Sequence, residues 1–294
     1  MKTSQELKSI VQEKYSEIAN QSKSDNAASC CGSGPVSGKV YHIMTDNYSG
    51  MDGYVEDADL GLGCGLPTEF AKIQKGDVVI DLGSGAGNDA FIARHETGIE
   101  GKVIGVDFTP AMIEKARSNA EKLGFHNVEF RLGDLEHMPV NEEVADVIVS
   151  NCVLNLVPDK QKVFSEIFRV LKAGGHFSIS DIVLLGDLPE ALQSDAEMYA
   201  GCVSGALPKA EYLHLIEEAG FKNVAIQKEK AILLPDDILE KYLSQEEIEA
   251  FAKREQGIFS ITVYAEKPGA KKKIKLASLQ EESALFCTPG GGCC

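Results

Sequence analysis

Short runs of strand-forming residues alternate with helical stretches from residue 77 onward, and this alternation restricts the fold more than any other feature of the chain. The predicted strands span 77–82, 102–107, 128–132, 145–150 and 176–183. The predicted helices lie between them, near 88–97, 110–124 and 159–172. Parallel strands need crossover connections, and these crossovers are right-handed. The pattern therefore predicts an α/β fold with a doubly wound, mostly parallel sheet.

The flanking segments have their own patterns. Residues 3–20 carry apolar side chains at helical spacing and predict an amphipathic helix, whereas the composition of 22–38 predicts a loop. Later elements are predicted as helices at 189–200 and 208–219, a strand near 223–233, two short helices within 236–255 and a strand at 258–265. We expect four parts: an N-terminal helix with a Cys-containing loop (1–66), a core domain (67–185), a mainly helical segment with closing strands (186–267) and a flexible Cys-rich tail (268–294).

The chain is acidic, with a formal net charge of −16 over 294 residues. Nucleic-acid-binding surfaces need clustered Lys and Arg, so this charge argues against a nucleic-acid partner and against an anionic membrane surface. No stretch reaches the roughly 18 apolar residues of a membrane span, and the N-terminus lacks the apolar core of a signal peptide. We therefore expect a cytoplasmic protein with no membrane and no nucleic-acid partner.

Cysteine is frequent, at positions 30, 31, 64, 152, 202, 287, 293 and 294. In a reducing cytosol such a set does not form a structural disulfide framework, which favours metal binding or catalysis. Zinc does not fit, because the sequence has no C-x-x-C pair and no closely spaced His cluster. Soft sulfur ligands instead select thiol-seeking elements.

A glycine-rich loop, D-L-G-S-G-A-G-N over 81–88, joins the first predicted strand to the first predicted helix. Gly83, Gly85 and Gly87 allow a sharp turn and the close approach of a ligand to the backbone. Asp107 ends the next strand, 20 residues after Gly87, where a carboxylate can hydrogen-bond ribose hydroxyls. The alternative for Asp107 is a helix-capping or solvated residue.

The loop lacks the G-x-G-x-x-G spacing that seats a pyrophosphate on a helix N-terminus. Asp81, directly before the glycines, repels a pyrophosphate but suits a ligand with an ammonium group. The third strand leads into Gly133–Glu136, an acidic end that suits the amino group of adenine. These features resemble the class I S-adenosylmethionine (SAM)-dependent methyltransferases over roughly residues 70–185. The resemblance implies a Rossmann-like methyltransferase domain and SAM as its cofactor.

The same resemblance assigns parts of SAM to residues of this chain. The residues implied for the methionine part are Asp81, Gly83, Ser84 and Gly85, with Gly87 in the same loop. Those implied for the ribose and adenine are Asp107, Phe108 and Met112, with Gly133, Asp134, Leu135 and Glu136 flanking the base. Asn151 would close the pocket.

Several cysteines occupy positions that favour function. Cys152 follows the fourth strand, and ligands bind at the carboxyl ends of strands in such sheets, although a lone cysteine there can equally be a buried apolar residue. Cys64 and Cys202 lie next to glycines in G-L-G-C-G and A-G-C-V-S-G, so neither is expected to fill a core. Cys30 and Cys31 form a doublet on the N-terminal loop, and one of the two can be redundant.

These residues resemble the arsenite SAM methyltransferases over nearly the whole chain up to about residue 266. The matching motifs are G-C-G at 63–65, N-C-V-L-N-L at 151–156 and G-C-V-S-G-A-L at 201–207, in the expected order around the SAM motifs. The chain departs from the family at Leu62, which is Tyr in animal and algal members. Its N-terminal loop is also longer and carries the cysteine doublet.

The second resemblance implies an enzyme that moves methyl groups from SAM to arsenite for detoxification. It makes Cys64, Cys152 and Cys202 the arsenic ligands and catalytic thiols. Cys30 or Cys31 would be a fourth thiol that pairs with Cys64 during redox cycling. An external thiol such as glutathione, or thioredoxin, is the implied reductant, and we expect a monomer.

The implied chemistry suits these residue types. Thiols replace the hydroxyls of neutral arsenite, three sulfurs leave one lone pair on As(III), and that lone pair attacks the SAM methyl group. The protein contributes mainly positioning, so no catalytic base is required. The segment 67–185 then binds SAM, and 186–267 covers the site and supplies Cys202.

Other functions stay open at this point. A methyltransferase for a quinone, a sterol or another small carbon substrate would use the same cofactor loop without thiols. A non-catalytic arsenic- or metal-binding protein would keep the thiols without turnover. The tail thiols Cys287, Cys293 and Cys294 either are incidental to a disordered end or form an arm that captures arsenic.

Overall fold

The structure is a computed structural model that describes residues 3–21, 46–186, 202–203, 205–233, 239–240, 244–246, 248 and 257–269. Some sequence predictions lie outside these residues, namely Cys30, Cys31, the helix at 189–200, most of 236–255 and the tail thiols.

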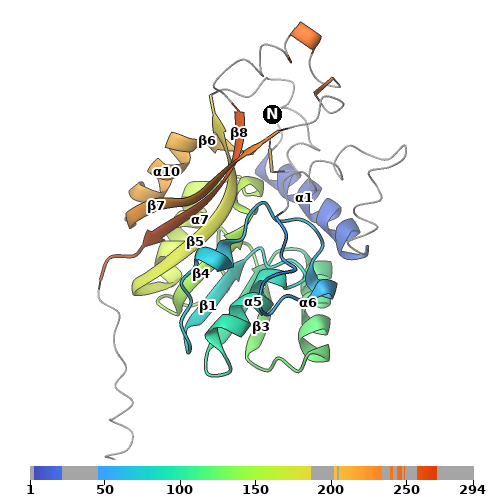
Figure 1. Cartoon of the computed structure of the whole chain (residues 1–294), viewed down its shortest axis with the longest axis vertical. Helices are drawn as coiled ribbons and strands as arrows, with labels where there is room; N and C mark the ends of the chain where they lie inside the picture. The colour runs from blue at the N-terminus through green and yellow to red at the C-terminus, as the bar shows by residue number, and fades with distance from the viewer. Residues whose placement is uncertain are drawn as a thin grey trace, which may run out of the picture.

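A mixed sheet of eight strands organises the described residues (Figure 1). Its strands are β1 (Val78–Leu82), β2 (Lys102–Asp107), β3 (Val128–Leu132), β4 (Ala145–Asn151), β5 (Leu171–Leu185), β6 (Leu207–Pro208), β7 (Lys222–Ile232) and β8 (Gly257–Glu266). The order is β3-β2-β1-β4-β5-β8-β7, and β6 pairs with the end of β5. Strands β1 to β5 run parallel, whereas β8 is antiparallel to both β5 and β7. The predicted doubly wound, mostly parallel α/β fold is confirmed.

Helices cover both faces of the sheet, as the alternation predicted. The helical elements are α1 (Ser4–Ala19), η1 (Glu56–Ala58), α4 (Pro67–Phe70), α5 (Asn88–Thr97), α6 (Pro110–Lys122), η2 (Leu154–Leu156), α7 (Lys160–Val170) and α10 (Lys209–Glu218). Neighbouring residues of β1 serve different cores: Val79 packs with α5 and α6, whereas Ile80 and Leu82 pack with α7 and α10. Because both faces of β1 are covered, its one acidic residue, Asp81, is buried.

One predicted boundary is wrong. The sequence suggested that the helix before the fifth strand continues to the glycine pair and that the strand begins at His176. Instead, α7 ends at Val170 and β5 begins at Leu171. Gly174 and Gly175 lie inside β5, where its pairing with β4 is shifted and Gly174 has a φ of +75°. The glycines therefore form an irregularity within a strand, and a bulge of this kind cannot be told from a helix end by composition alone.

The N-terminal helix α1 packs across the carboxyl end of the sheet (Figure 1). It begins with a capping box in which Thr3 and Glu6 satisfy each other's backbone amides. Its residue Val11 is buried, and its Gln12 Nε2 donates to the Phe108 carbonyl at 2.9 Å. A helix from the start of the chain thus covers the region where the parallel strands end.

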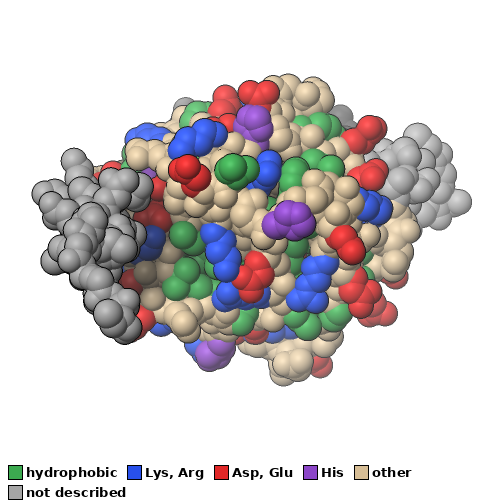
Figure 2. Space-filling view, turned by 90° about the horizontal axis from the view of Figure 1, so that it is seen from below, with side chains coloured by type: hydrophobic (Ala, Val, Ile, Leu, Met, Phe, Trp, Pro, Cys, Tyr) green, Lys and Arg blue, Asp and Glu red, His purple; other side chains and the backbone are tan. Residues whose placement is uncertain are grey.

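The opposite end of the molecule carries charges of both signs. Lys, Arg, Asp and Glu side chains lie side by side on the face seen from below in Figure 2. This face is therefore mixed in charge even though the chain has a net charge of −16. Within the described ranges, the helices are too short or too polar to cross a bilayer.

Candidate active site

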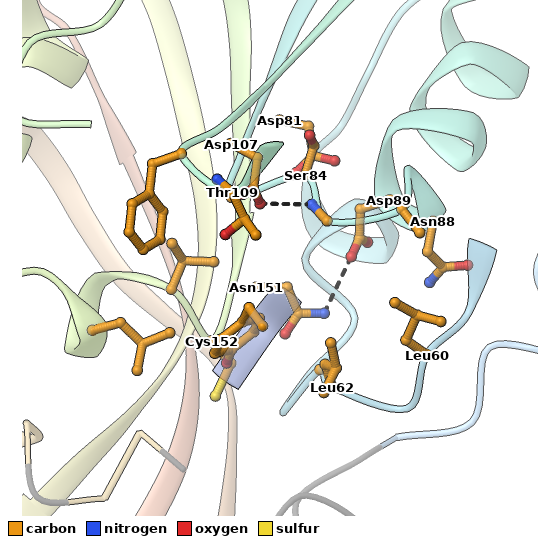
Figure 3. Close-up of a pocket in the computed structure, with 18 of the residues that line it drawn as sticks. Leu60, Leu62, Asp81, Ser84, Asn88, Asp89, Asp107, Thr109, Asn151 and Cys152 are labelled. Atoms are coloured by element: carbon orange, nitrogen blue, oxygen red, sulfur yellow. Dashed lines mark hydrogen bonds between the residues drawn. The ribbon is translucent and has the colours of Figure 1, made fainter. Parts of the chain in front are cut away.

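A pocket opens where β1 and β4 end (Figure 3). The sheet order reverses between these two strands, and doubly wound sheets bind ligands at such a reversal. The pocket encloses about 1060 Å³, including the part open to solvent. Its lining includes α1, the glycine loop, the loop before α4, and the residues that follow β2, β3 and β4.

The glycine loop after β1 forms one wall of the pocket. Gly83 and Gly85 have φ angles of +64° and +50°, in the left-handed region that favours glycine. A Cβ on Gly83 would lie 2.4 Å from the Val153 side chain, whereas a Cβ on Gly85 would meet the Met112 sulfur at 4.0 Å. Packing therefore requires glycine at 83, and the backbone at 85 is open to a ligand.

Besides Asp59, three carboxyl groups, those of Asp81, Asp89 and Asp107, line the pocket although each is buried. Burial raises the pKa of Asp81 well above its usual value, and the charges of the other two carboxyl groups raise it further. Burial also raises the pKa of Asp107, and it raises the pKa of Asp89 to about 6 against hydrogen bonds from neighbouring side chains. A positively charged ligand would relieve this repulsion.

Several polar atoms in the same wall lack a protein partner. Asp81 Oδ2, Ser84 Oγ and Asn88 Oδ1 are buried and make no hydrogen bond to any described residue. Buried polar atoms are normally paired, so atoms left open at a pocket indicate a bound ligand. SAM carries an ammonium group and a sulfonium, which suit the three acids, and hydroxyl groups that suit the other atoms. The residues present therefore fit SAM.

Asp107 stabilises the local structure and also lines the pocket. Its Oδ2 accepts the Gly85 amide at 3.0 Å, and its Oδ1 accepts the Thr109 amide at 2.8 Å. Thr109 is the N-cap of α6, and its own side chain makes no capping bond. Asp107 thus holds the glycine loop against the start of α6 while it lines the pocket, so the two alternatives raised by the sequence are compatible.

The acidic residues after β3 are already engaged. Lys8 Nζ of α1 lies 2.6 Å from Asp134 Oδ2 and 2.6 Å from Glu136 Oε2. Burial lowers the pKa of Lys8, but the hydrogen bonds to both carboxylates outweigh it and raise the pKa. Burial alone would raise the pKa of Asp134, but the hydrogen bond from Lys8 outweighs this effect, so the pKa of Asp134 is lowered. The two ion pairs of Lys8 hold α1 over the pocket beside Leu135.

The structure places some predicted cofactor residues away from the pocket wall. Gly87 is the N-cap of α5 with a φ of +102°, and Met112 of α6 is fully buried against α1. Gly133 lies against a proline ring, and Glu136 forms the ion pair just described. These positions shape the loops around the pocket.

Sequence reasoning missed several residues of the pocket. Asn88 and Asp89 directly follow the glycine motif, so a longer reading of the motif could have found them. Tyr48 comes from the loop before η1, while Lys8 and Tyr15 come from α1. No spacing in the sequence connects these last three with the glycine loop.

Asn151 joins the pocket to the first thiol loop. Its Oδ1 accepts the Cys64 amide at 3.0 Å, and its Nδ2 donates to the Gly65 carbonyl at 2.8 Å and to Asp89 Oδ2 at 3.3 Å. Its Nδ2 also contacts the Tyr48 hydroxyl, which donates to Asp89 Oδ2 at 2.9 Å. One amide side chain therefore fixes the Cys64 loop relative to the buried acids (Figure 3).

The thiols of Cys64, Cys152 and Cys202 come together beside the pocket, and all three are free and buried. The expectation that Cys64 and Cys202 would not fill a core is wrong, because both pack in an apolar cluster despite their neighbouring glycines. Hydrogen bonds of the Cys152 thiol with Cys202 and Cys64, together with burial, raise the pKa of Cys152 well above its usual value. Burial also raises the pKa of Cys64. Cys202 Sγ donates to the Cys152 carbonyl at 2.9 Å. Cys152 is therefore the protonated centre of a linked series of thiols.

Cys152 belongs to both features, because it lines the pocket (Figure 3) and packs in one buried cluster with the other two thiols. Cys152 and Cys202 have φ angles of +60° and +65°, which are uncommon for residues with a Cβ and often mark functional sites. In the part of the chain that the structure describes, no three Cys, His, Asp or Glu side chains are arranged as ligands of a metal ion. The thiols are neighbours in series and do not form a preformed metal cage.

Known methyltransferases resemble this chain in sequence. A model of a methyltransferase domain family matches residues 73–220. An arsenite methyltransferase from Halobacterium salinarum is 40% identical over 278 residues, which cover 90% of this chain and 67% of that protein. The chain belongs to the arsenite methyltransferase family.

Other members of the arsenite methyltransferase family agree with this assignment. An arsenite methyltransferase from Aquipseudomonas alcaligenes is 32% identical over 240 residues, which cover 79% of this chain and 67% of that protein. The crystal structure of an arsenic(III) S-adenosylmethionine methyltransferase from Chlamydomonas reinhardtii superposes with a TM-score of 0.59 at 32% identity, covering 72% of this chain and 69% of that one. Both resemblances drawn from the sequence are confirmed at the level of the family, and the chain is a SAM-dependent methyltransferase.

Proposed function

We propose that this enzyme transfers methyl groups from SAM to arsenite held by Cys64, Cys152 and Cys202. The observation that carries the proposal is the position of Cys152, which lines the cofactor pocket and packs in one buried cluster with both other cysteines. A methyltransferase of a quinone or another carbon substrate has no need of buried thiols at this wall.

The cofactor would lie between the glycine loop and α1. Asp81 and Ser84, whose buried oxygens lack partners among the described residues, would bind the methionine part. Asp107 would accept from the ribose, and Phe108 and Leu135, both in the lining, would contact the adenine. SAM, when bound, supplies an electrophilic methyl group on a positively charged sulfur. The buried acids stabilise that charge until transfer removes it.

The thiols would bind arsenite without a base. Burial raises the pKa of both Cys64 and Cys152, so the two thiols stay protonated. Each thiol replaces one hydroxyl of As(OH)₃: one S–H and one As–O bond break, one As–S bond forms, and the departing hydroxyl takes the thiol proton and leaves as water. Because no net proton is released, raised pKa values do not prevent this step. The three sulfurs leave one lone pair on arsenic for the methyl group.

The remaining work of the protein is positioning. Asn151 fixes the Cys64 loop against Asp89, so the two binding regions share one set of hydrogen bonds. Precise placement of two reactants can lower a barrier by about 7–11 kcal/mol.

Further assignments follow from the same proposal. Cys30 or Cys31 would pair with Cys64 when the methylated arsenic is reduced, and glutathione or thioredoxin would reduce the resulting disulfide. We place the enzyme in the cytoplasm as a monomer, with SAM bound by 67–185 and with 186–267 covering the arsenic site and supplying Cys202.

The test is to incubate purified protein with labelled SAM, a thiol reductant and arsenite, and to measure methylated arsenic for the wild type and for Cys152→Ser. We expect methylated arsenic from the wild type and none from the variant, with SAM affinity retained. A wild type that binds SAM but methylates no arsenic would contradict the proposal and favour a carbon substrate.

A further inference from the structure

Asp181 is a buried carboxyl group that the proposed reaction does not use. It lies on β5 and is 0% exposed. Its Oδ2 accepts a hydrogen bond from the Tyr212 hydroxyl of α10 at 3.0 Å, whereas its Oδ1 makes no hydrogen bond of good geometry with the described residues. Burying a carboxyl group destabilises the fold, and an oxygen without a hydrogen bond adds to this free-energy cost. The presence of an acid at this position therefore calls for a physical explanation.

The groups around this carboxyl come from several elements. Burial raises the pKa of Asp181 to about 7, and the Tyr212 hydroxyl, the Lys160 ammonium and the backbone amides of Leu154 and Asn155 oppose that effect. Lys160 is on α7, and its side chain is itself buried. The two amides belong to the first residues of η2, where a helix has free donors. The carboxyl group is thus the acceptor that faces the start of η2.

η2 directly follows the strained turn that carries Cys152. The Cys152 amide donates to the Ser180 carbonyl at 2.8 Å, and Asn155 Nδ2 donates to the Ile182 carbonyl at 2.6 Å. With Asp181 facing the η2 amides, three consecutive residues of β5 hold the turn at 152–155. This attachment explains how Cys152 keeps a φ of +60° without being glycine.

Asp181 also reaches the element that follows the third thiol. Tyr212 lies on α10, which comes shortly after Cys202 in the chain, and Lys160 interacts electrostatically with both Asp181 and Cys202. We propose that Asp181 is a positioning residue that holds the Cys152 turn and, through Tyr212, the segment after Cys202 at the spacing required for both thiols to bind trivalent arsenic. This inference rests on the proposed function and adds a residue to it.

The experiment compares Asp181→Leu, which removes the acceptor, with Asp181→Asn, which keeps one acceptor oxygen in a side chain of the same shape. Arsenite binding is measured by equilibrium filtration and SAM binding by calorimetry. Because hydrogen bonds to charged groups are strong, we expect Asp181→Leu to weaken arsenite binding by about 10-fold or more and to leave SAM affinity within about 2-fold. Asp181→Asn should restore most of the arsenite affinity.

A second readout needs no arsenite. Iodoacetamide labelling of each thiol is followed by mass spectrometry, and Asp181→Leu should speed labelling of buried Cys152. If Asp181→Leu does not fold, Tyr212→Phe decides, since it removes one bond to Asp181 and should raise both the arsenite dissociation constant and the Cys152 labelling rate.

Equal loss of arsenite and SAM binding, or arsenite binding and Cys152 labelling that match the wild type in these variants, would overturn the positioning role. A wild type that binds no arsenite would instead refute the proposed function. The labelling rates would then still decide whether Asp181 holds the turn.

Discussion

Asp81 is the residue on which cofactor binding depends most directly. It is buried at the end of β1, its pKa is raised by burial and by two neighbouring acids, and its Oδ2 has no partner among the described residues. An empty pocket therefore favours the protonated acid, whereas a cationic ligand favours the carboxylate. Binding of SAM should release protons, and affinity should rise with pH until Asp81 is ionised in the free enzyme.

Asp81→Asn tests this electrostatic role, because it keeps the shape of the side chain and removes the charge. We expect SAM affinity to fall by about 10-fold or more and proton release to decrease, as measured by calorimetry in two buffers of different ionisation enthalpy. Ser84→Ala is the matched control: it removes a neutral partner and should weaken binding without changing proton release. Unchanged proton release in Asp81→Asn would show that another group takes up the charge.

Single residues also show how much of the candidate site could be predicted from the sequence. Asp81 and Ser84 were predictable because the glycine motif fixes their place at the end of a buried strand. Cys64, Cys152 and Cys202 were predicted to converge, and they do. Their hydrogen bonds were not predictable, since these depend on left-handed backbone conformations that no composition indicates.

Among the elements, α1 has the most specific attachment to the pocket. Lys8 binds Asp134 and Glu136, and Gln12 binds the backbone after β2, so the helix is held at two points. The helix itself was predictable from its apolar periodicity, but its packing partner was not. The acids that it contacts lie 126 and 128 residues further along the chain, and periodicity carries no information on that distance.

Lys8→Met should loosen α1 while preserving the length of the side chain. We expect faster hydrogen exchange of the α1 amides and several-fold faster release of SAM, because the pair that fastens the helix is lost. Lys14→Met is the control, since Lys14 pairs at 3.5 Å with Glu17 of the same helix and has no ion pair with another element among the described residues. If both variants exchange alike, the ion pair does not hold the helix.

At the scale of the whole molecule, buried acids make stability depend on pH. The folded-state pKa values of about 6 for Asp89 and about 7 for Asp181 exceed the usual aspartate value of 3.8. Between these values the folded protein binds more protons than the unfolded chain, so the free energy of unfolding falls as the pH rises from about 4 to about 7. Ion-paired acids such as Glu129, whose pKa is lowered to about 2, act in the opposite sense only below this window.

Urea denaturation of the SAM-free protein at about pH 5 and about pH 8 measures this dependence. We expect a lower midpoint at the higher pH, with a contribution of about 1 kcal/mol from Asp89 alone over this pH interval. Asp89→Asn should reduce the difference, and SAM should raise the midpoint more at about pH 8. A midpoint that increases with pH in the wild type would contradict this account.

Most of the fold was predictable because strands buried on both faces and amphipathic helices can be recognised from the local spacing of apolar residues. The start of β5 was missed because a bulge at Gly174 has the same composition as a helix end. Residues of the pocket that come from α1 and from the loop at Tyr48 were missed because the fold, not the local sequence, brings them to the glycine loop.

The double membership of Cys152, in the pocket wall and in the thiol series, has a consequence for the life of the enzyme in the cell. A cofactor in the pocket shields this sulfur from oxidants and electrophiles, and an empty pocket leaves it open. The catalyst is therefore most vulnerable between turnovers, and a well-supplied methyl donor protects the enzyme as well as serving its reaction.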